Sequence, residues 1–226
     1  MPSPVSASDS IVTLMDVAVV VERVPVLRGL TLGVTAGESV GVVGANGSGK
    51  STLLRVLATL LAPVRGHGRV LGAELGTDEI FAVRPGIALV GHVPSLYPRL
   101  TLRENLRFLA RLTGRREQAA DDALESVGLA PAGDRRAEVC SQGMLRRAEL
   151  ARVLLAQPRL LLLDEAHAGL DDGSIGLVEF VIRRVSERGG ASVIVSHDQP
   201  RLRGLADRMV EIRNGQAVPA DEEVPA

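Results

Sequence analysis

Short apolar runs alternate along this chain with longer segments in which apolar residues recur at helical spacing. Runs of β-branched and aliphatic residues bounded by glycine or polar turns are typical of strands. We expect strands within residues 11–21, 27–34, 39–44, 64–75, 86–91, 159–164, 191–197 and 208–212. The run SVGVVG at 39–44 has almost no polar side chains, which is typical of a strand buried in a parallel sheet.

The helical segments fill the gaps between these runs. We expect helices over residues 50–62, 101–112, 116–128, 143–157 and 173–188. Pro63 and Pro158 follow the first and the fourth of these segments, and Thr101 and Glu104 have the spacing of a capping box at the start of the second. Because strands alternate with helices, the pattern predicts an α/β fold around a mostly parallel sheet.

A long helical region interrupts the strand-bearing parts of the chain. We interpret residues 92–145 as a helical subdomain inserted into a single domain that spans 11–216. The polar ends, 1–10 and 217–226, are expected to be flexible tails. The start of the chain lacks the apolar core of a signal peptide. No apolar run approaches the roughly 20 residues of a membrane-spanning helix, so we expect any membrane role to come through a partner.

The charge balance gives no support for a nucleic-acid partner and leaves open what one arginine-rich stretch faces. The chain has 226 residues and a formal net charge of -1, so no overall basic field favours nucleic acid. The arginine-rich stretch 99–116 could face acidic lipid or a partner, but a solvated helix face is the expected interpretation. A single cysteine, Cys140, cannot form an intrachain disulfide, which suits a reducing cytosol.

The one lysine of the chain lies in a glycine-rich loop. Of the 26 basic residues 25 are arginine, and Lys50 stands within GANGSGKST at 44–52. This loop matches G-x-x-x-x-G-K-[ST] in full, after an apolar strand and before a helix. Its backbone N–H groups are expected to surround phosphates, with Lys50 at the β- and γ-phosphates and the Ser51 hydroxyl on Mg²⁺. The predicted nucleotide-binding residues are Gly44, Ala45, Asn46, Gly47, Ser48, Gly49, Lys50, Ser51 and Thr52.

Two carboxylates and a histidine follow other apolar strands. Asp164 and Glu165 end the run LLLLDE, and ligands gather at the carboxyl ends of strands in an open parallel sheet. We predict that Asp164 holds Mg²⁺ and that Glu165 is the general base for an attacking water. His197 ends the run SVIVSH and is a candidate for contact with the γ-phosphate, although its position equally fits a hydrogen-bonded loop residue.

The segment CSQGMLRRAELARVLLAQPRLLLLDE at 140–165 resembles the nucleotide-binding subunit of ABC transporters. Ser141 and Gly143 match the Ser-Gly-Gly-Gln signature of that family, whereas Gln142 and Met144 depart from it. The residues of the following helix that fall where the family has them are Arg147, Ala151 and Arg152. The triplet GLD at 169–171 resembles the D-loop.

This resemblance covers about residues 11–215 and implies a complete architecture and activity. The fold would be a P-loop NTPase core with an N-terminal antiparallel β subdomain and an inserted helical subdomain. The chain would bind ATP and Mg²⁺, and would hydrolyse ATP to drive a separate transmembrane permease at the cytoplasmic face of the cell membrane. Two copies would pack head to tail, so that Ser141 and Gly143 of one close over the γ-phosphate held by the other. His197 would be the switch histidine.

Three positions depart from the family pattern. Val21 stands where an aromatic side chain usually stacks on adenine, and it offers only apolar contact. His92 stands where a glutamine usually contacts Mg²⁺, and because Mg²⁺ prefers oxygen ligands we expect contact through water. Ala166 replaces the proline after the glutamate. The stretch GHVPSLYPRLT from Gly91 onward also resembles the haem-exporter ATPase of cytochrome c maturation, and drug and lipid exporters carry similar stretches.

Two other classes of function use a similar loop. A small-molecule kinase would need an acceptor pocket and a lid, and it would have no use for SQG before an arginine-rich helix. The sequence does not exclude a non-transport relative, such as an iron–sulfur-assembly ATPase. Phosphorylation of added metabolites would indicate the kinase, and co-purification with an integral membrane protein would indicate transport.

Overall fold

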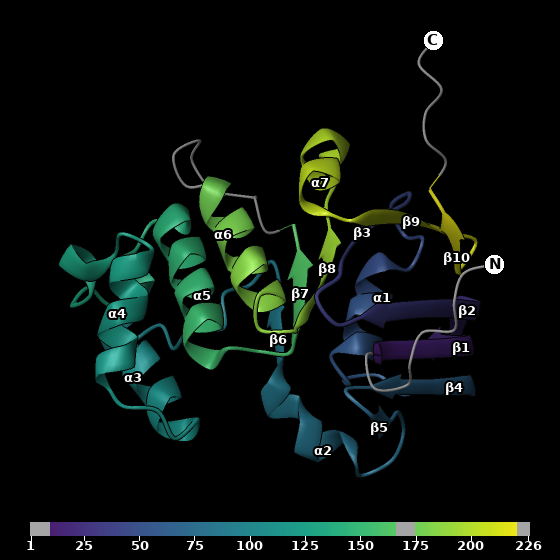
Figure 1. Ribbon diagram of the computed structural model, residues 1–226, viewed down its shortest axis with the longest axis horizontal. Helices are drawn as coiled ribbons and strands as arrows, with labels where there is room; N and C mark the ends of the chain where they lie inside the picture. The colour runs from purple at the N-terminus through teal and green to yellow at the C-terminus, as the bar shows by residue number, and fades with distance from the viewer. Residues whose placement is uncertain (1–9, 166–174, 221–226) are drawn as a thin grey trace.

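Two sheets with helices between and beside them make up the protein, whose computed structural model describes residues 10–165 and 175–220 (Figure 1). The first sheet is antiparallel, in the order β2-β1-β4-β5. Its strands are β1 (Ser10–Val21), β2 (Val24–Thr35), β4 (Arg65–Val70) and β5 (Ala73–Glu74). This sheet is the N-terminal antiparallel subdomain that the family resemblance implied.

The second sheet carries the carboxyl-terminal strand ends that matter for function. Its order is β10-β9-β3-β8-β7-β6, and every pairing is parallel except that of β10 with β9. The strands are β3 (Ser39–Val43), β6 (Ile87–Val90), β7 (Leu160–Asp164), β8 (Ala191–Val195), β9 (Arg208–Arg213) and β10 (Gln216–Pro219). The predicted α/β fold with a mostly parallel sheet is therefore confirmed.

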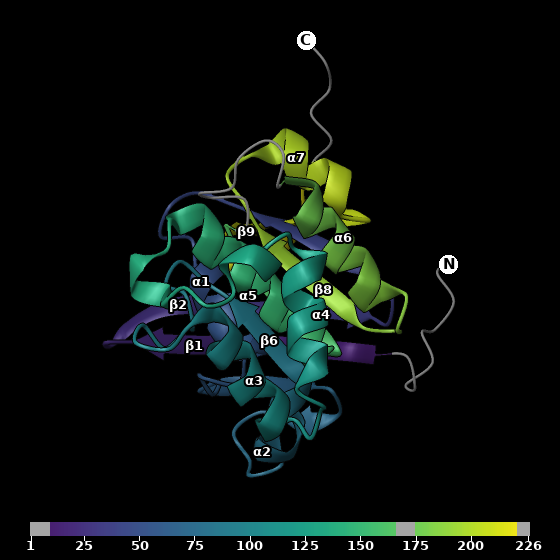
Figure 2. The same cartoon turned by 90° about the vertical axis from the view of Figure 1, so that its left-hand side faces the viewer.

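The helices gather mainly on one side of the parallel sheet, where Figure 2 shows α3, α4 and α5 in front of it. The α-helices are α1 (Lys50–Leu57), α2 (Ile80–Val83), α3 (Leu102–Leu112), α4 (Gln118–Ser126), α5 (Gln142–Ala156), α6 (Ile175–Ser186) and α7 (Gln199–Leu205). Short 3₁₀ turns cover Arg84–Gly86, Ala130–Ala132 and Ala137–Val139. The sequence pattern missed α2 and α7 because such short helices carry little periodic signal.

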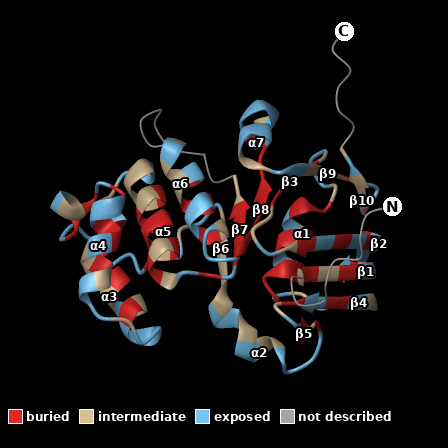
Figure 3. Cartoon of the chain, viewed as in Figure 1, coloured by how far each residue is buried: buried red, intermediate tan, exposed pale blue. Residues whose placement is uncertain are grey.

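Strand β7 shows how the layers are held together. Leu160 and Leu162 pack into a core with the antiparallel sheet and α1, whereas Leu161 and Leu163 pack into a second core with the helical layer. All four leucine side chains are fully buried, and most of the strand is red in Figure 3. Because neighbouring side chains point to opposite faces, one apolar strand serves both cores. Its carboxyl end is thereby fixed between them.

Helix α1 ends earlier than predicted, at Leu57 and not at residue 62. Thr59 adopts a left-handed backbone conformation with φ of 59°. The Leu60 amide donates to the Arg55 carbonyl at 2.8 Å, and this bond closes the helix in a Schellman-type turn. The Arg84 guanidinium donates to the Thr59 hydroxyl at 3.0 Å and holds the turn. The helix therefore ends in a left-handed turn at a threonine, and a tertiary contact is made to that turn.

Both expected tails overlap with strands. Ser10 belongs to β1, and β10 occupies Gln216–Pro219 within the range expected to be a tail from 217 onward. β10 pairs with β9 at the edge of the sheet, where a terminal proline such as Pro219 does not disturb the ladder. The expected helical insertion, 92–145, also ends inside α5, which runs on to Ala156.

The capping box predicted at the start of α3 is present. The Thr101 hydroxyl accepts a hydrogen bond from the Glu104 amide at 3.0 Å, and the Glu104 carboxylate accepts one from the Thr101 amide at 2.8 Å. The bond from the Thr101 amide lowers the pKa of Glu104. This reciprocal pair fixes where the helical layer begins.

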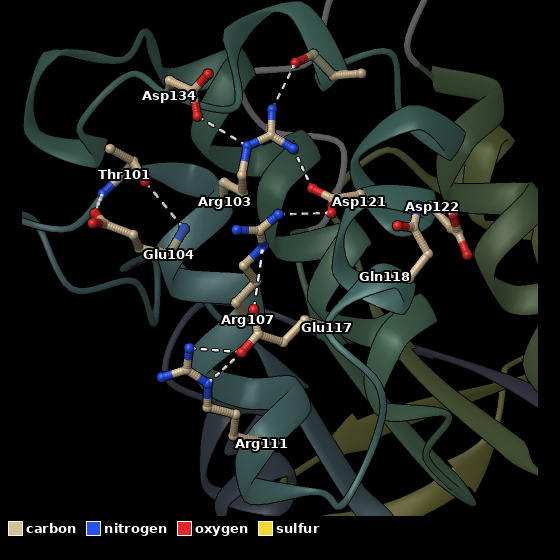
Figure 4. A network of polar contacts seen from close by, with 11 residues as sticks. Thr101, Arg103, Glu104, Arg107, Arg111, Glu117, Gln118, Asp121, Asp122 and Asp134 are labelled. Atoms are coloured by element: carbon tan, nitrogen blue, oxygen red, sulfur yellow. Dashed lines mark hydrogen bonds and ion pairs between the residues drawn. The ribbon is translucent and has the colours of Figure 1, made fainter.

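The arginines of α3 face acidic residues of α4 in the network of Figure 4. Arg103 and Arg107 both contact the Asp121 carboxylate, the latter at 2.9 Å, and Arg111 lies 2.6 Å from Glu117. The hydrogen bond from Arg107, followed by that from Arg103, lowers the pKa of Asp121. Much of the arginine-rich stretch 99–116 is therefore paired within the helical layer.

Asp121→Asn is expected to destabilise the fold by about 1 kcal/mol at pH 7, because it removes the negative charge between two guanidinium groups and replaces one of the two acceptor oxygens with a donor. Since the pKa of Asp121 is lower in the folded state, its contribution is present above the pKa of the unfolded carboxyl, about 3.9, and is lost as the pH falls below it. Urea denaturation at pH 7, 5 and 3.5 measures both effects.

The matched control is Asp122→Asn, the same change one position along α4. Asp122 is exposed and its carboxylate accepts a hydrogen bond only from Gln118 within the described residues. We expect a loss below about 0.5 kcal/mol. Equal losses in the two variants would contradict the role of the arginine pair.

Candidate functional site

A cavity of about 510 Å³ lies over the carboxyl ends of the parallel strands. It is lined by Val26, Asn46, Gly47, Gly49, Lys50, Ser51, Thr52, His92, Asp164, Glu165, Val195 and His197. Most of these residues follow strands β3, β8, β7 or β6, which lie side by side in that order in the sheet. The parallel topology therefore brings the predicted phosphate loop, both carboxylates and both histidines to one edge.

The loop at 44–49 takes a shape that only glycine permits at two positions. Gly44 has φ of 144°, and a Cβ there would lie 2.6 Å from the Ile212 carbonyl oxygen. Gly49 has φ of 113°, and a Cβ there would lie 2.9 Å from Leu27. The loop thus packs its backbone directly against β2 and β9, and its open side faces the cavity.

Lys50 begins α1 and is almost fully buried, with 8% of its surface exposed. Its Nζ donates to the Gly44 carbonyl at 2.7 Å and to the Ala45 carbonyl at 3.0 Å. The ammonium therefore spans the loop from within and lines the cavity. A compact cation at the amino end of a helix makes this place suitable for an anion.

Oxygen atoms suitable for Mg²⁺ meet beside this loop. The Ser51 hydroxyl donates to the Asp164 carboxylate at 3.4 Å, and His92 Nε2 lies 3.8 Å from the same Asp164 oxygen. Among the described residues, no three His, Cys, Asp or Glu side chains are grouped to hold a metal on their own. The Ser51 hydroxyl and the Asp164 carboxylate fit an ion that takes its remaining ligands from phosphate and water, as Mg²⁺ usually does.

Glu165 has a left-handed backbone conformation, and one of its two carboxylate oxygens accepts no hydrogen bond from the described residues. Its φ is 53°, its amide donates to the Val195 carbonyl at 2.9 Å, and its carbonyl accepts from Arg146 at 3.0 Å. One carboxylate oxygen accepts from the Ser196 hydroxyl at 3.4 Å, and the other lies 3.6 Å from His197 Nε2. Sequence reasoning missed both Ser196 and Arg146.

Five shielded polar atoms have no hydrogen-bond partner among the residues that the structure describes, and two of them, Glu165 Oε1 and Ser48 Oγ, belong to residues that line a cavity. Buried polar atoms are normally paired, so these two have hydrogen-bonding capacity left for a ligand. Ser48 and Ala45 line a second cavity of about 490 Å³, which shares Asn46, Gly47 and Val26 with the first. The phosphate loop therefore has open space on two sides.

The structure does not place Val21 in either cavity. Val21 pairs with Val24 across the β1–β2 turn and packs against the core, whereas Val24 lines the second cavity and Val26 lines both. The apolar contact expected of Val21 thus comes from the next strand. Alternation along β2 is the signal that could have identified these two residues.

Ser141 and Gly143 lie at the start of α5 and outside the cavity of their own chain. The Ser141 hydroxyl accepts a hydrogen bond from the Met144 amide at 3.2 Å, so Ser141 is the N-cap of α5. Gly143 is the second residue of that helix. The predicted D-loop at 169–171 and Ala166 lie outside the described residues.

Across residues 10–165 and 175–220, none of the helices combines the length and the apolar character needed to cross a membrane.

Comparison with known proteins identifies close relatives. The ABC transporter family profile matches residues 27–168, more than half of the chain. The cytochrome c biogenesis ATP-binding export protein CcmA of Bordetella bronchiseptica is 43% identical over 176 residues, which is 75% of this chain and 76% of that protein. The daunorubicin/doxorubicin resistance ATP-binding protein DrrA of Streptomyces peucetius is 37% identical over 194 residues, which is 84% of this chain but only 58% of that protein.

A solved structure has the same fold. A dimeric ATP-binding cassette in a post-hydrolysis state, bound to ADP and Pi, superposes with a TM-score of 0.83 at 24% identity and covers 93% of this chain and 98% of its own. The family match, the two relatives and the convergence of the phosphate loop with Asp164 and Glu165 agree with one another. The chain belongs to the ABC transporter family, as an ATP-binding subunit with ATPase activity.

Proposed function

We propose that the cavity binds Mg²⁺ and ATP, that Glu165 drives hydrolysis, and that two copies of the chain use this reaction to power an exporter-type permease. The observation that carries the proposal is the meeting of Lys50, Ser51, Asp164, Glu165 and His197 in one cavity. A phosphate loop alone would bind a nucleotide. The carboxylates at its open side are what a hydrolase requires in addition.

Binding depends on the loop and its neighbours. The N–H groups of 45–51 face the phosphates, and Lys50 turns its ammonium from the loop carbonyls toward the β- and γ-phosphate oxygens. The Ser51 hydroxyl and Asp164 hold the ion, with His92 beside them. When bound, Mg²⁺ neutralises phosphate charge and fixes the geometry of the triphosphate. Val24 and Val26 offer an apolar surface to the base without aromatic stacking.

Hydrolysis depends on Glu165. Its free oxygen, Oε1, accepts a hydrogen bond from a water molecule and takes the proton as the water oxygen bonds to the γ-phosphorus. The bond from the γ-phosphorus to the bridging oxygen breaks, ADP leaves with that oxygen, and the proton passes on to phosphate. Ser196 holds the other carboxylate oxygen, and His197 lies beside Oε1 at the mouth of the site.

The site needs a second copy of the chain. Ser141 and Gly143 begin α5 but do not line the cavity of their own chain, although a helix start with a serine hydroxyl suits an anion. In the proposed dimer each helix start covers the γ-phosphate held by the other copy. The solved ATP-binding cassette of the same fold is dimeric, which supports this arrangement.

The transport role rests on the relatives. CcmA is named an export protein and DrrA a resistance protein. We therefore propose that the dimer binds an exporter-type transmembrane permease and acts at the cytoplasmic face of the cell membrane. Copurification from native membranes with an integral protein tests this part.

Lys50→Ala is expected to weaken ATP binding at least about a hundredfold and to leave the fold intact, because the only cation inside the loop is lost while the helix former alanine keeps α1. Titration with a fluorescent ATP analogue measures the affinity and circular dichroism the fold. Arg55→Ala, which removes an exposed cation from the same helix, is the control and should bind normally. Undiminished affinity in Lys50→Ala would exclude this site.

Glu165→Gln is expected to bind ATP normally and to hydrolyse it about 10²- to 10⁴-fold more slowly, because an amide cannot take the proton. Phosphate release measures the rate, and size-exclusion chromatography with ATP and Mg²⁺ should show dimers accumulating. Glu125→Gln on the exposed face of α4 is the matched control and should behave as the wild type. Transfer of phosphate to an added metabolite in place of phosphate release would indicate a kinase.

Ser141→Asp is expected to stop hydrolysis without destabilising the chain, since aspartate is as good an N-cap as serine but repels a triphosphate. Ser141→Asn, which caps equally well without charge, should retain more activity. Mixing Ser141→Asp with Lys50→Ala chains should restore activity, because one of the two sites in a mixed dimer then has an intact loop and an intact Ser141. Two inactive variants that stay inactive after mixing would contradict a shared site.

A further inference from the structure

We infer that Arg146 is a positioning residue for hydrolysis: its guanidinium joins the loop ends that follow β6 and β7 and holds the Glu165 backbone in its left-handed conformation. This inference rests on the proposed role of Glu165 as the base. Arg146 itself does not line the cavity and would act only through Glu165.

Arg146 donates hydrogen bonds to two backbone carbonyls from two different nitrogens. Nη1 donates to the Gly91 carbonyl at 2.9 Å, and Nη2 donates to the Glu165 carbonyl at 3.0 Å. Gly91 directly follows Val90, which lies opposite Leu163 in the last pair of the β6–β7 ladder, and Glu165 lies two residues after Leu163. The guanidinium therefore links the segments that follow β6 and β7 beyond the end of the ladder between these two strands.

The backbone of Glu165 needs such a link. A φ of 53° is uncommon for a residue with a side chain, and it persists only where neighbouring contacts determine it. One such contact comes from the sheet, since the Glu165 amide donates to the Val195 carbonyl at 2.9 Å. The second is the bond from Arg146 to the carbonyl. Without it, the peptide bond that follows Glu165 is freer to rotate, and the Glu165 carboxylate no longer keeps its direction.

Helix α5 is bonded to the loop after β6 at two points. Arg146 holds Gly91, and one turn further along α5 the buried Glu149 carboxylate accepts from the Ser95 amide at 3.0 Å. Arg152 lies 3.0 Å from both Glu149 oxygens and keeps that carboxylate paired. A shift of α5 or of residues 91–95 therefore changes the bond that Arg146 makes to Glu165.

Arginine suits this position better than other cations. The guanidinium is planar and carries donors on two separate nitrogens, so one side chain reaches two carbonyls at once. Arg146 has only 7% of its surface exposed. Burial lowers its pKa, while the nearby carboxylates of Glu149, Asp164 and Glu165 act in the opposite direction.

The test compares Arg146→Met with Arg115→Met in steady-state ATPase assays. Arg115 also reaches two acceptors, Ala156 O and Gln157 Oε1, but at the far end of α5. We expect Arg146→Met to lower kcat at least tenfold, with KM and the affinity for a fluorescent ATP analogue changed less than about twofold. Arg115→Met should keep its kcat. A kcat for Arg146→Met within twofold of wild type would overturn the inference.

A loss of folding must be separated from a loss of positioning. If kcat falls only in proportion to the fraction of chains that bind the analogue, Arg146 is merely structural and the inference fails. Arg146→Lys keeps the buried charge on a single nitrogen, and we expect its kcat to lie between those of Arg146→Met and wild type at unchanged affinity. Should Arg146→Met not fold, a kcat for Arg146→Lys equal to wild type overturns the inference and a lower kcat supports it.

The proposed function is tested separately in the same assay by Glu165→Gln. If Glu165→Gln hydrolyses ATP at the wild-type rate, Glu165 is not the base and the inference about Arg146 falls with it. If Glu165→Gln is inactive while Arg146→Met retains full activity, only the inference about Arg146 is wrong.

Discussion

The burial of β7 on both faces is the constraint on which the rest of the structure depends. Four successive leucines pack alternately into two cores, and a one-residue slip in register would turn each side chain toward the opposite core. The strand therefore ends at one fixed place, and Asp164 and Glu165 come directly after it. Parallel pairing with β8 and β6 then fixes what stands beside these carboxylates. The packing of β7 therefore determines where the two carboxylates lie at the edge of the sheet.

Much of this arrangement is predictable from the chain alone. The apolar runs mark nearly all of the parallel strands, and a strand, glycine loop and helix in succession predict the phosphate site before any geometry is known. Asp164, Glu165 and His197 can be assigned to the same edge because the carboxyl ends of parallel strands meet there. Local chemistry and strand direction together are sufficient for these residues.

The remainder depends on contacts between residues far apart in the sequence. Ser196 and Arg146 contact Glu165 from 31 and 19 positions away, and the patterns in which they stand do not indicate that contact. The turn that ends α1 early is contacted at Thr59 by Arg84, 25 positions distant. Val26 reaches the cavity only because the antiparallel sheet packs beside the loop. Sequence patterns report which elements form, whereas these effects depend on which side chains meet.

The position of Lys50 has a chemical consequence of its own. Because no other lysine exists in the chain, the sole ε-amine is the one held between the Gly44 and Ala45 carbonyls. Any acylation, glycation or other covalent modification of a lysine side chain in this protein must therefore occur at this loop. If the loop binds ATP as proposed, such a modification removes the cation that the phosphates need, and a bound nucleotide protects the amine from reaction.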